Sequence, residues 1–484
     1  MAIDPLKILF VASEVEGLIK TGGLADVARA LPRYLAQQGH DVRIILPFYK
    51  TLKRRNEARL LASRWLPTPA GQEDIGYRLH QLELDGFPVY LIDCPRYFER
   101  AEPYAEHNQA YGDNGERFAF LAAATLHATE QLGFAPDIVH CNDWHTGLLP
   151  LLLKTRHGHN PFFAQTRSVI SIHNAAFQGV FDRQQFWAVP EIQDYEQRIN
   201  YDYGHINLLK CGVLYADKIN AVSPNYASEL LTHLGAHGMA SVFQQRAADL
   251  RGILNGCDYQ DWDPATDPHL PANYDAKALR GKRLCRAQLQ QDAGLPTSDD
   301  PVYGMVCRLT EQKGVHLLIP ALESFLRHKV QLVIVGSGDP TLAGQLQALA
   351  ARFPTRLAFI NTYDDRLAHL VEAGADIFLM PSLFEPCGLN QMYSLAYGTL
   401  PLVRAVGGLK DTVVDWDAAE QATGFCFTDP TANGLLDAMR RSLLYFLQEP
   451  ERFARVQHTA MQTRFDWPDS VAQYVQMYRD ALGR

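Results

Sequence analysis

The sequence predicts an α/β protein built from two doubly wound, Rossmann-like domains that face each other across a deep cleft. Short runs rich in β-branched residues alternate with helical patterns along almost the whole chain, which is typical of parallel sheets covered by helices. A turn-rich stretch at 255–274 interrupts the alternation, which then restarts. With 484 residues the chain is too long for one ordinary core, so length alone favours two or three domains.

The first half carries the patterns of one such domain. Helices are expected at 24–38 and at 114–132, the second with Asn114 as its N-cap. Between residues 60 and 97 the polar and apolar residues alternate, which favours antiparallel strands in an insertion or at a sheet edge. The expected parallel strands are 7–13, 42–47, 137–141, 169–173 and 218–222.

The second half repeats the scheme and ends in an amphipathic helix at 466–482. The two halves also share an echo, because the residues at 22–26 and 407–411 both begin Gly-Gly-Leu and end in Asp. Each copy is placed where a loop leads into a helix, a natural position for binding an anion. The expected strands are 302–307, 331–336, 357–360, 376–380 and 399–403.

Composition argues against several classes of function. The net charge is −9 and no long basic tract occurs, so a nucleic-acid partner is not expected. The longest apolar runs fall short of the roughly 20 residues that span a bilayer, and the N-terminus resembles neither a signal nor a transit peptide. Eight cysteines without C-x-x-C spacing favour buried thiols in a reducing compartment. We therefore expect a cytoplasmic protein without a membrane partner.

Several loops at predicted strand ends carry candidate functional residues in the first half. Lys20 and the glycine pair Gly22 and Gly23 precede a helix, where close backbone approach and a full positive charge favour a phosphate or a sugar. A tight turn is the alternative. Asp143 and His173-Asn174 follow two strands of one sheet, on the side where such sheets bind ligands.

In the second half, Arg308 and Lys313 share the loop after one strand, where two cations could neutralise a departing diphosphate. The alternative is a pair of exposed charges. The segment 381–391 leads from the next candidate strand into a helix and contains Glu385, which could stabilise developing positive charge or bind sugar hydroxyls. A carboxylate that merely favours a helix N-terminus is the alternative.

Three other motifs are interpreted as structural. Asp261-Trp262-Asp263 and Asp415-Trp416-Asp417 match the D-x-D of metal-dependent glycosyltransferases, but the first lies in a turn-rich segment and the second in an acidic helical stretch. Gly336-Ser337-Gly338 lacks the third glycine of a dinucleotide fingerprint. No metal and no organic cofactor is therefore expected.

Taken together, the motifs resemble the bacterial glycogen synthase and plant starch synthase family almost from end to end. The resemblance rests on Lys20–Val27, His140–His145, Ile172–Asn174, Asn255–Tyr259, Arg308–Gly314, Pro381–Gln391 and Tyr397–Leu409. It implies a GT-B fold and retaining transfer of glucose from ADP-glucose to the non-reducing end of an α-1,4-glucan such as glycogen. It also implies an N-terminal acceptor-side domain at 1–255, a donor-side domain at 256–464, and a final helix at 465–484 that crosses back to the first domain.

The resemblance also implies roles for individual residues. Arg308 and Lys313 would bind the donor diphosphate, while Lys20, Gly22 and Gly23 would line the donor site. The transferred glucose would be surrounded by Glu385, Asp143, His173 and Asn174. Backbone amides at Cys387, Gly388 and Leu389 would contact the donor, Tyr363 would stack on the base, and Asn255 would also contact substrate. The sequence departs from the family at several positions, including Gly17 for a usual proline and Asn390 for a frequent threonine.

Three rival readings remain at this level. The same fold could use UDP-glucose or a short oligosaccharide acceptor. A glucan phosphorylase also has two domains, but it needs a lysine-bound pyridoxal phosphate, for which the sequence shows no motif. A non-catalytic glucan-binding protein would be expected to have lost the charged set, whereas Lys20, Lys313 and Glu385 are all present.

Overall fold

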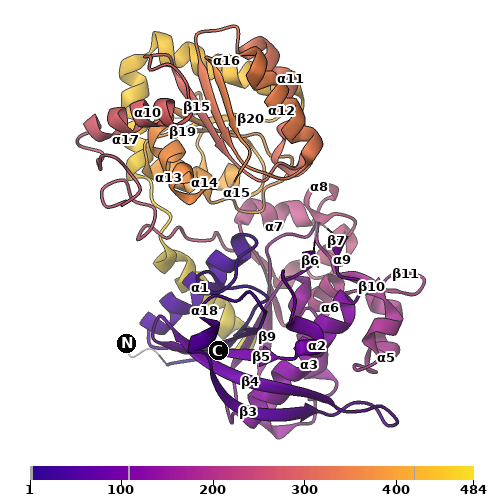
Figure 1. Ribbon diagram of the computed structural model, residues 1–484. Helices are drawn as coiled ribbons and strands as arrows, with labels where there is room; N and C mark the ends of the chain where they lie inside the picture. The colour runs from indigo at the N-terminus through magenta and orange to yellow at the C-terminus, as the bar shows by residue number, and fades with distance from the viewer. Residues whose placement is uncertain (1–3, 107–108, 363, 419) are drawn as a thin grey trace. The chain divides into compact units, whose positions relative to one another are not determined.

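A computed structural model describes residues 4–106, 109–362, 364–418 and 420–484, and shows two compact units (Figure 1). The first unit comprises Met1–Asn255 together with Trp467–Arg484, and the second comprises Gly256–Asp466. Each unit is built around its own sheet, with helices on both faces. The prediction of two α/β domains with mainly parallel sheets is confirmed.

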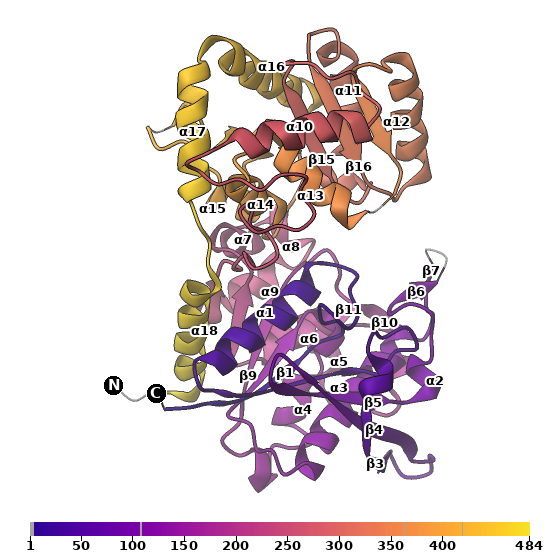
Figure 2. The same cartoon turned by 60° about the vertical axis from the view of Figure 1, so that its left-hand side comes forward.

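The first unit contains a nine-stranded sheet in the order β14-β13-β9-β8-β1-β2-β5-β4-β3. Its central strands are almost entirely buried, as expected for strands with helices on both faces of the sheet (Figure 2). The strands are β14 (Leu250–Gly252), β13 (Lys218–Ala221), β9 (Arg167–Ile172), β8 (Ile138–Asn142), β1 (Lys7–Val11), β2 (Asp41–Pro47), β5 (Phe87–Asp93), β4 (Ile75–Leu84) and β3 (Arg59–Leu66).

The edge of this sheet is antiparallel, as the alternation between residues 60 and 97 predicted. Strand β4 pairs antiparallel with both β3 and β5, while β5 joins β2 in parallel. A separate three-stranded sheet of β10 (Val180–Asp182), β12 (His205–Asn207) and β11 (Asn200–Asp202) was not predicted. Its strands have three residues each, too few for a recognisable periodicity.

The predicted helix at 114–132 is present as α3 (Asn114–Gln131), but the prediction of Asn114 as its N-cap is wrong. The N-cap residue is Asp113, and Asn114 lies inside the first turn. The buried Asn114 amide instead donates to the Tyr104 carbonyl at 2.9 Å and accepts from the buried Arg117 guanidinium at 2.6 Å. Tertiary hydrogen bonds, which sequence does not reveal, thus use the side chain that would otherwise have capped the helix.

The last helix, α18 (Trp467–Leu482), packs within the first unit. Its Tyr478 hydroxyl lies 2.6 Å from Nδ1 of the buried His140 in β8, and its Ser470 hydroxyl donates to the Leu254 carbonyl at 2.6 Å. Farther along the helix, the Tyr474 hydroxyl accepts from the Asn220 amide at 2.8 Å. These polar contacts fix the helix against the sheet at defined positions.

Replacing Tyr478 by phenylalanine is expected to lower the free energy of unfolding by about 1–3 kcal/mol, because a buried histidine nitrogen loses its partner. Burial already lowers the pKa of His140 to about 3, so the ring stays neutral and cannot compensate by protonation. Urea unfolding would measure the change. Tyr203→Phe is the control, since Tyr203 is 97% exposed; equal losses in the two variants would contradict the contact.

The second unit contains an all-parallel six-stranded sheet in the order β17-β16-β15-β18-β19-β20. Helices α11 (Val315–Phe325), α12 (Pro340–Arg352) and α16 (Ala432–Gln448) contribute to the core on one face. Helices α10 (Arg280–Asp292) and α13 (Asp365–Gly374) contribute to the core on the other. The strands are β17 (Leu357–Ile360), β16 (Gln331–Val335), β15 (Val302–Val306), β18 (Ile377–Met380), β19 (Leu400–Arg404) and β20 (Phe425–Phe427).

The segment Asp415-Trp416-Asp417 is structural, although it lies in a turn and not in the helical stretch that we expected. Trp416 is fully buried and stacks on Phe425 with ring centroids 5.3 Å apart. Both carboxylates pair with Arg441, at 2.7 and 2.6 Å. The buried tryptophan fixes the turn, because its ring needs a place in the core that a regular helix would not provide.

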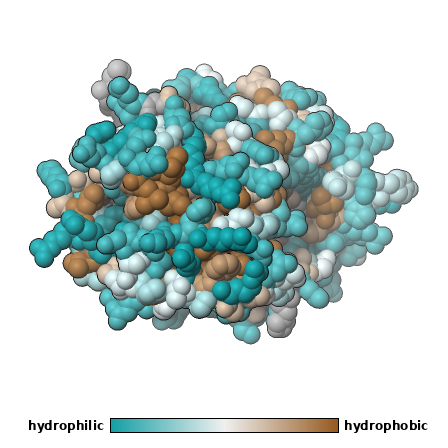
Figure 3. All heavy atoms as spheres, turned by 90° about the horizontal axis from the view of Figure 1, so that it is seen from above, coloured by the Kyte–Doolittle hydropathy of each residue, from teal (hydrophilic) through white to brown (hydrophobic). Residues whose placement is uncertain are grey.

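Among the described residues, no helix is long and apolar enough to cross a membrane. On the face drawn in Figure 3, hydrophobic residues form several separate patches among hydrophilic ones.

Candidate active site

The loop after β1 is held from inside by Glu14, a buried carboxylate. Glu14 Oε2 accepts hydrogen bonds from the backbone N–H groups of Thr21 and Gly22, at 2.5 and 3.0 Å, and Oε1 accepts from the Tyr104 hydroxyl at 2.8 Å. Burial nevertheless raises the pKa of Glu14 above its ordinary value. The carboxylate thus fixes the backbone just before α1 (Gly23–Gln37), where the sequence predicted a binding loop.

Lys20 lies in the same loop between two carboxylates. Its Nζ is 2.7 Å from both Glu16 Oε2 and Asp26 Oδ1, and 44% of the side chain is exposed. The ion pairs raise the pKa of Lys20 against the opposing effect of burial, so the amine stays protonated. The positive charge expected from sequence is present, but two neighbouring carboxylates compensate it.

A cavity of about 380 Å³ borders this loop. Lys20, Thr21, Lys53 and Tyr104 are among the residues that line it. The lining also includes the Glu102 carboxylate and the apolar side chains of Leu18 and Ile19, so it does not by itself select a class of ligand.

Asp143 connects two strand ends on the same edge of the sheet. It follows β8, and its Oδ1 accepts from the backbone N–H groups of His173 and Asn174, at 2.7 and 3.4 Å, just beyond the neighbouring strand β9. His173 Nε2 also lies 2.9 Å from Asn142 Oδ1. The structure therefore brings together Asp143, His173 and Asn174, which the sequence placed only on separate strand ends.

Asp143 has a strained backbone conformation and a carboxyl group whose pKa is raised. Asp143 has φ +52° and ψ −169°, a conformation that side-chain-bearing residues rarely adopt. Burial raises the pKa of its carboxyl to about 7, although the hydrogen bonds from His173 and Asn174 oppose this rise. Burial also lowers the pKa of His173 to about 3, so its imidazole is neutral. Strain of this kind concentrates at functional sites.

In the second unit, the loops that follow β15 and β18 interlock. The Leu383 N–H donates to the Gln312 carbonyl at 2.8 Å, and the Gln312 amide donates to the Phe384 carbonyl at 3.3 Å. Gly314 has φ +71°, and a Cβ there would lie 2.0 Å from the Pro381 carbonyl oxygen. Glycine at this position allows the two loops to touch.

The interlocked loops bring Lys313 and Glu385 into contact. Lys313 Nζ lies 2.6 Å from Glu385 Oε2, which also accepts from the buried Ser382 hydroxyl at 3.0 Å. Arg404, at the end of β19, donates to the carbonyls of Ser382 and Leu383 and fixes the turn that carries Glu385. Glu385 is thus a buried carboxylate with a fixed cation, and not the helix-end carboxylate of the alternative reading, because α14 begins only at Asn390.

Arg308 lies in the same loop as Lys313 but is exposed. Its side chain forms no hydrogen bond or ion pair with any residue that the structure describes. One cation is therefore held by a carboxylate, while the other is available to an anionic ligand.

The second Gly-Gly pair packs against the Glu385 turn. The Gly408 N–H donates to the Glu385 carbonyl at 3.1 Å, and a Cβ on Gly408 would lie 2.2 Å from the Cys387 carbonyl oxygen. Gly407 has φ +44°, and a Cβ there would lie 1.9 Å from the Glu385 carbonyl oxygen. In the second copy of the Gly-Gly pair, both positions therefore require glycine, because a Cβ at either one would collide with a backbone carbonyl oxygen.

Replacing Gly408 by alanine is expected to displace the Glu385 turn and to lower the activity of the chain about 10²-fold, since displacements of about 1 Å have effects of this size. Gly344→Ala is the matched control, because a Cβ there meets nothing within 4 Å and the residue lies inside α12. That control should gain stability by up to about 1 kcal/mol. Full activity of Gly408→Ala would contradict the prediction that activity depends on the position of the Glu385 turn.

Three of the remaining predicted residues, Cys387, Gly388 and Leu389, follow Glu385 in the chain. The other two are Asn255 and Tyr363. Cys387 is buried, Gly388 has φ +74°, and Leu389 is the residue before α14. Asn255 is buried, and its Oδ1 has no hydrogen-bond partner among the described residues. Tyr363 follows β17 but lies outside the described residues.

Two departures from the family pattern have a visible structural consequence. Gly17 has φ +84°, which a proline cannot adopt. The loop before Lys20 therefore has a backbone conformation that the usual proline would not allow. The Asn390 amide donates to the Val306 carbonyl at 3.0 Å, joining the start of α14 to the end of β15. A threonine hydroxyl is too short to make the same contact without movement.

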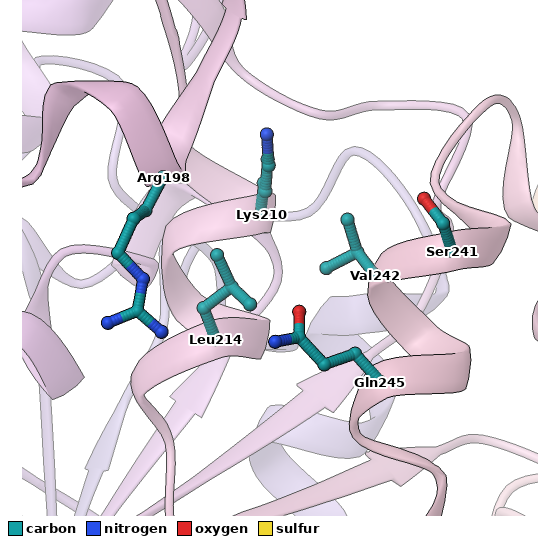
Figure 4. A pocket seen from close by; sticks show the side chains of 6 residues that line it. All are labelled: Arg198, Lys210, Leu214, Ser241, Val242 and Gln245. Atoms are coloured by element: carbon teal, nitrogen blue, oxygen red, sulfur yellow. The ribbon is translucent and has the colours of Figure 1, made fainter.

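A second cavity, of about 280 Å³, contains none of the predicted site residues. It lies among α5 (Ile192–Ile199), α6 (Leu208–Tyr215) and α9 (Ala240–Gln245) (Figure 4). The cations Arg198 and Lys210 point in different directions there, and Lys210 Nζ donates to the Asn200 carbonyl. Their geometry is not that of an anion clamp.

Sequence reasoning missed several supporting residues, namely Glu14, Tyr104, Ser382 and Arg404. Glu14, Ser382 and Arg404 each form a hydrogen bond with a loop that the sequence did single out, and Tyr104 acts through Glu14. The available signal was position, because Glu14 lies shortly after β1, while Ser382 and Arg404 lie within named motifs whose other members were assigned roles.

Comparison with known proteins identifies the family. A model described as starch synthase catalytic domain matches residues 7–245, and one described as glycosyl transferases group 1 matches residues 288–455. The chain is 82% identical to a protein named glycogen synthase from Aeromonas hydrophila, over 100% of both sequences. It belongs to the glycogen synthase family. The glycogen synthase of Photobacterium profundum is 57% identical over 98% of this chain and 94% of that protein.

Solved structures agree with the glycogen synthase assignment. The catalytic domain of starch synthase IV from Arabidopsis thaliana, in a complex with ADP and acarbose, has a TM-score of 0.90 and 30% identity, with 99% of this chain and 100% of that chain covered. A sucrose-phosphate synthase from Thermosynechococcus elongatus shares the fold, with a TM-score of 0.61 and 18% identity over 98% and 99% of the two chains. The chain is therefore a glycosyltransferase with the GT-B fold.

Proposed function

We propose that this member of the glycogen synthase family transfers glucose from ADP-glucose to the non-reducing end of an α-1,4-glucan, with retention of anomeric configuration. The observation that carries the proposal is the 2.6 Å contact between Lys313 and the buried Glu385, at adjoining strand ends of the second unit. The related starch synthase IV was solved with ADP and acarbose, which supports an adenine nucleotide donor and a glucan-like acceptor.

The proposed leaving-group site consists of Arg308, Lys313 and the backbone amides at Cys387, Gly388 and Leu389. When the glucosyl–phosphate bond breaks, negative charge develops on the departing diphosphate. Cations and amides that are already in position stabilise this charge without reorganising. We propose that they replace a metal ion in this role, so that the transfer needs neither a metal nor an organic cofactor.

Glu385 in the second unit is proposed to contact the transferred glucose, and Asp143, His173 and Asn174 are the residues of the first unit proposed to contact glucose. As the sugar acquires oxocarbenium character, the buried Glu385 carboxylate stabilises the developing positive charge. Lys20, Gly22 and Gly23 line the donor site, with the loop held in shape by Glu14. Because Glu16 and Asp26 already balance the Lys20 charge, Lys20 supplies hydrogen bonds more than net charge.

We propose that the acceptor hydroxyl attacks on the face from which the diphosphate leaves. Glu385 does not suit the role of a covalent nucleophile, because its Oε2 is engaged by both Lys313 and Ser382. Mass spectrometry of rapidly quenched enzyme is expected to show no glucosyl adduct, and a trapped adduct would overturn this step.

Stepwise digestion of the labelled product tests the proposed reaction. Glycogen labelled from ADP-glucose would be treated with an exo-amylase that removes maltose from non-reducing ends. Release of the label at the start of digestion is expected. Label that persists until late digestion would place the new glucose elsewhere and contradict the proposal.

We place the reaction in the cytoplasm, because eight free thiols fit a reducing compartment.

A further inference from the structure

We propose that the second unit holds a structural divalent cation, most suitably Zn²⁺, on His269, Asp365 and His369. Among the described residues these three form a group whose ligand atoms all lie within 4.8 Å of one another. None of the three residues is among those proposed for glucosyl transfer.

The helix supplies two of the ligands with suitable spacing. Asp365 and His369 are four residues apart at the start of α13, so their side chains project from the same face. His269 comes from the turn-rich stretch before α10, and its ring lies over that of His369, with centroids 4.6 Å apart. The three ligands thus join a helix to a loop that is nearly one hundred residues away in sequence.

His369 is oriented as metal-binding histidines are. Its Nδ1 lies 2.7 Å from Oδ2 of the buried Asp267, which also accepts from the Tyr397 hydroxyl at 2.5 Å. The Asp267 carboxylate thus accepts from both groups, so Nδ1 of His369 carries the proton. Nε2 is then left with its lone pair, as in carboxylate–histidine–zinc arrangements.

Packing fixes the plane of the His369 ring. Trp262 stacks on it with centroids 3.7 Å apart and an angle of 9° between the planes, and the opposite face of Trp262 stacks on Tyr393. The turn around His269 is also fixed, because its N–H donates to Asp267 Oδ1 at 2.8 Å. Asp267 therefore positions both histidines.

Little movement is needed to reach zinc geometry. Zinc–nitrogen bonds of 2.0–2.1 Å place neighbouring ligands of a tetrahedral site about 3.4 Å apart. Asp365 is exposed and His269 is half-buried, so these two side chains can approach the rigid His369. Two imidazoles and one carboxylate favour zinc over the harder Mg²⁺ and Ca²⁺, and water would complete the coordination.

Calorimetric titration of Zn²⁺ into the chelator-treated full chain tests the proposal, with thermal unfolding as a second readout. We expect one ion per chain with a micromolar or lower Kd, and a higher unfolding temperature with zinc. His269→Ala and Asp365→Asn should each weaken binding at least tenfold and remove the thermal effect. These variants leave the Trp262–His369 stack intact, so they should fold.

His233→Ala is the matched control, because His233 is exposed on α8 (His233–Ala236) of the first unit, whereas the proposed ligands belong to the second unit. It should bind zinc like the unaltered chain. Binding only at millimolar zinc, or binding that survives both ligand substitutions but is lost after thiol alkylation, would overturn the site. Neither readout depends on glucosyl transfer, so the result is independent of the proposed function.

Discussion

Replacing Lys313 by alanine is expected to lower kcat for glucosyl transfer by about 10²–10³-fold, the usual effect of removing one preorganised charge at a reacting centre. Lys313 would no longer stabilise the leaving diphosphate, and the buried Glu385 would lose its cation. Glu385→Ala is expected to cause a loss of similar size. Initial rates of labelled glucose incorporation would measure both.

The double variant Lys313→Ala/Glu385→Ala distinguishes joint action of the two residues from independent roles. If Lys313 and Glu385 act as a unit, the double variant should be little worse than either single one. Multiplying losses would instead indicate independent roles. Lys329→Ala is the control, because Lys329 is exposed in the same unit and should retain full activity. A single variant with unchanged kcat would contradict the proposed leaving-group site.

Replacing Asp143 by asparagine is expected to stabilise the fold at pH 8 while lowering glucosyl transfer by about 10²-fold or more. In the folded chain burial raises the pKa of Asp143 from 3.8 to about 7. The folded state therefore holds this proton more tightly than the unfolded state, and stability falls as pH rises from about 4 through 7. The full difference corresponds to about 4 kcal/mol.

Asparagine is nearly the same shape and keeps an oxygen for the His173 N–H, but it never ionises. Unfolding free energies of the two proteins should therefore be similar below about pH 4 and diverge between about pH 4 and 7, with half of the difference reached near pH 5.4. Asp480→Asn is the control, because the hydrogen bonds from Gln476 and Arg251 lower the pKa of this half-buried group, so it should not gain stability at pH 8. Parallel pH profiles of unaltered and Asp143→Asn protein would contradict the raised pKa.

The strands of the fold could be predicted because they are buried on both faces. Runs such as that of β16 are continuously apolar, and their predicted ends differ from the observed ones by one or two residues. The three-residue strands and the Asn114 N-cap could not be predicted in the same way. Their conformations depend on contacts outside the local pattern, such as the hydrogen bond from the Asn114 amide to the Tyr104 carbonyl ahead of α3.

The sequence located the loops of the candidate site but not their contacts. Lys313 follows β15 and Glu385 follows β18; two strands separate β15 from β18 along the chain, yet the two are neighbours in the sheet. That crossover, and with it the ion pair, is a property of the topology. The strain and the raised pKa of Asp143 likewise depend on burial beneath loops that meet only in the folded unit.

The most direct test is incorporation of labelled glucose into glycogen, with ADP-glucose and UDP-glucose compared side by side and no Mg²⁺ added. We expect strong transfer from ADP-glucose, little from UDP-glucose, and no dependence of the rate on added Mg²⁺. Transfer from UDP-glucose alone would contradict the proposed donor. Transfer from neither donor, or only with added metal, would contradict the proposal that Arg308, Lys313 and the loop amides together hold the leaving group.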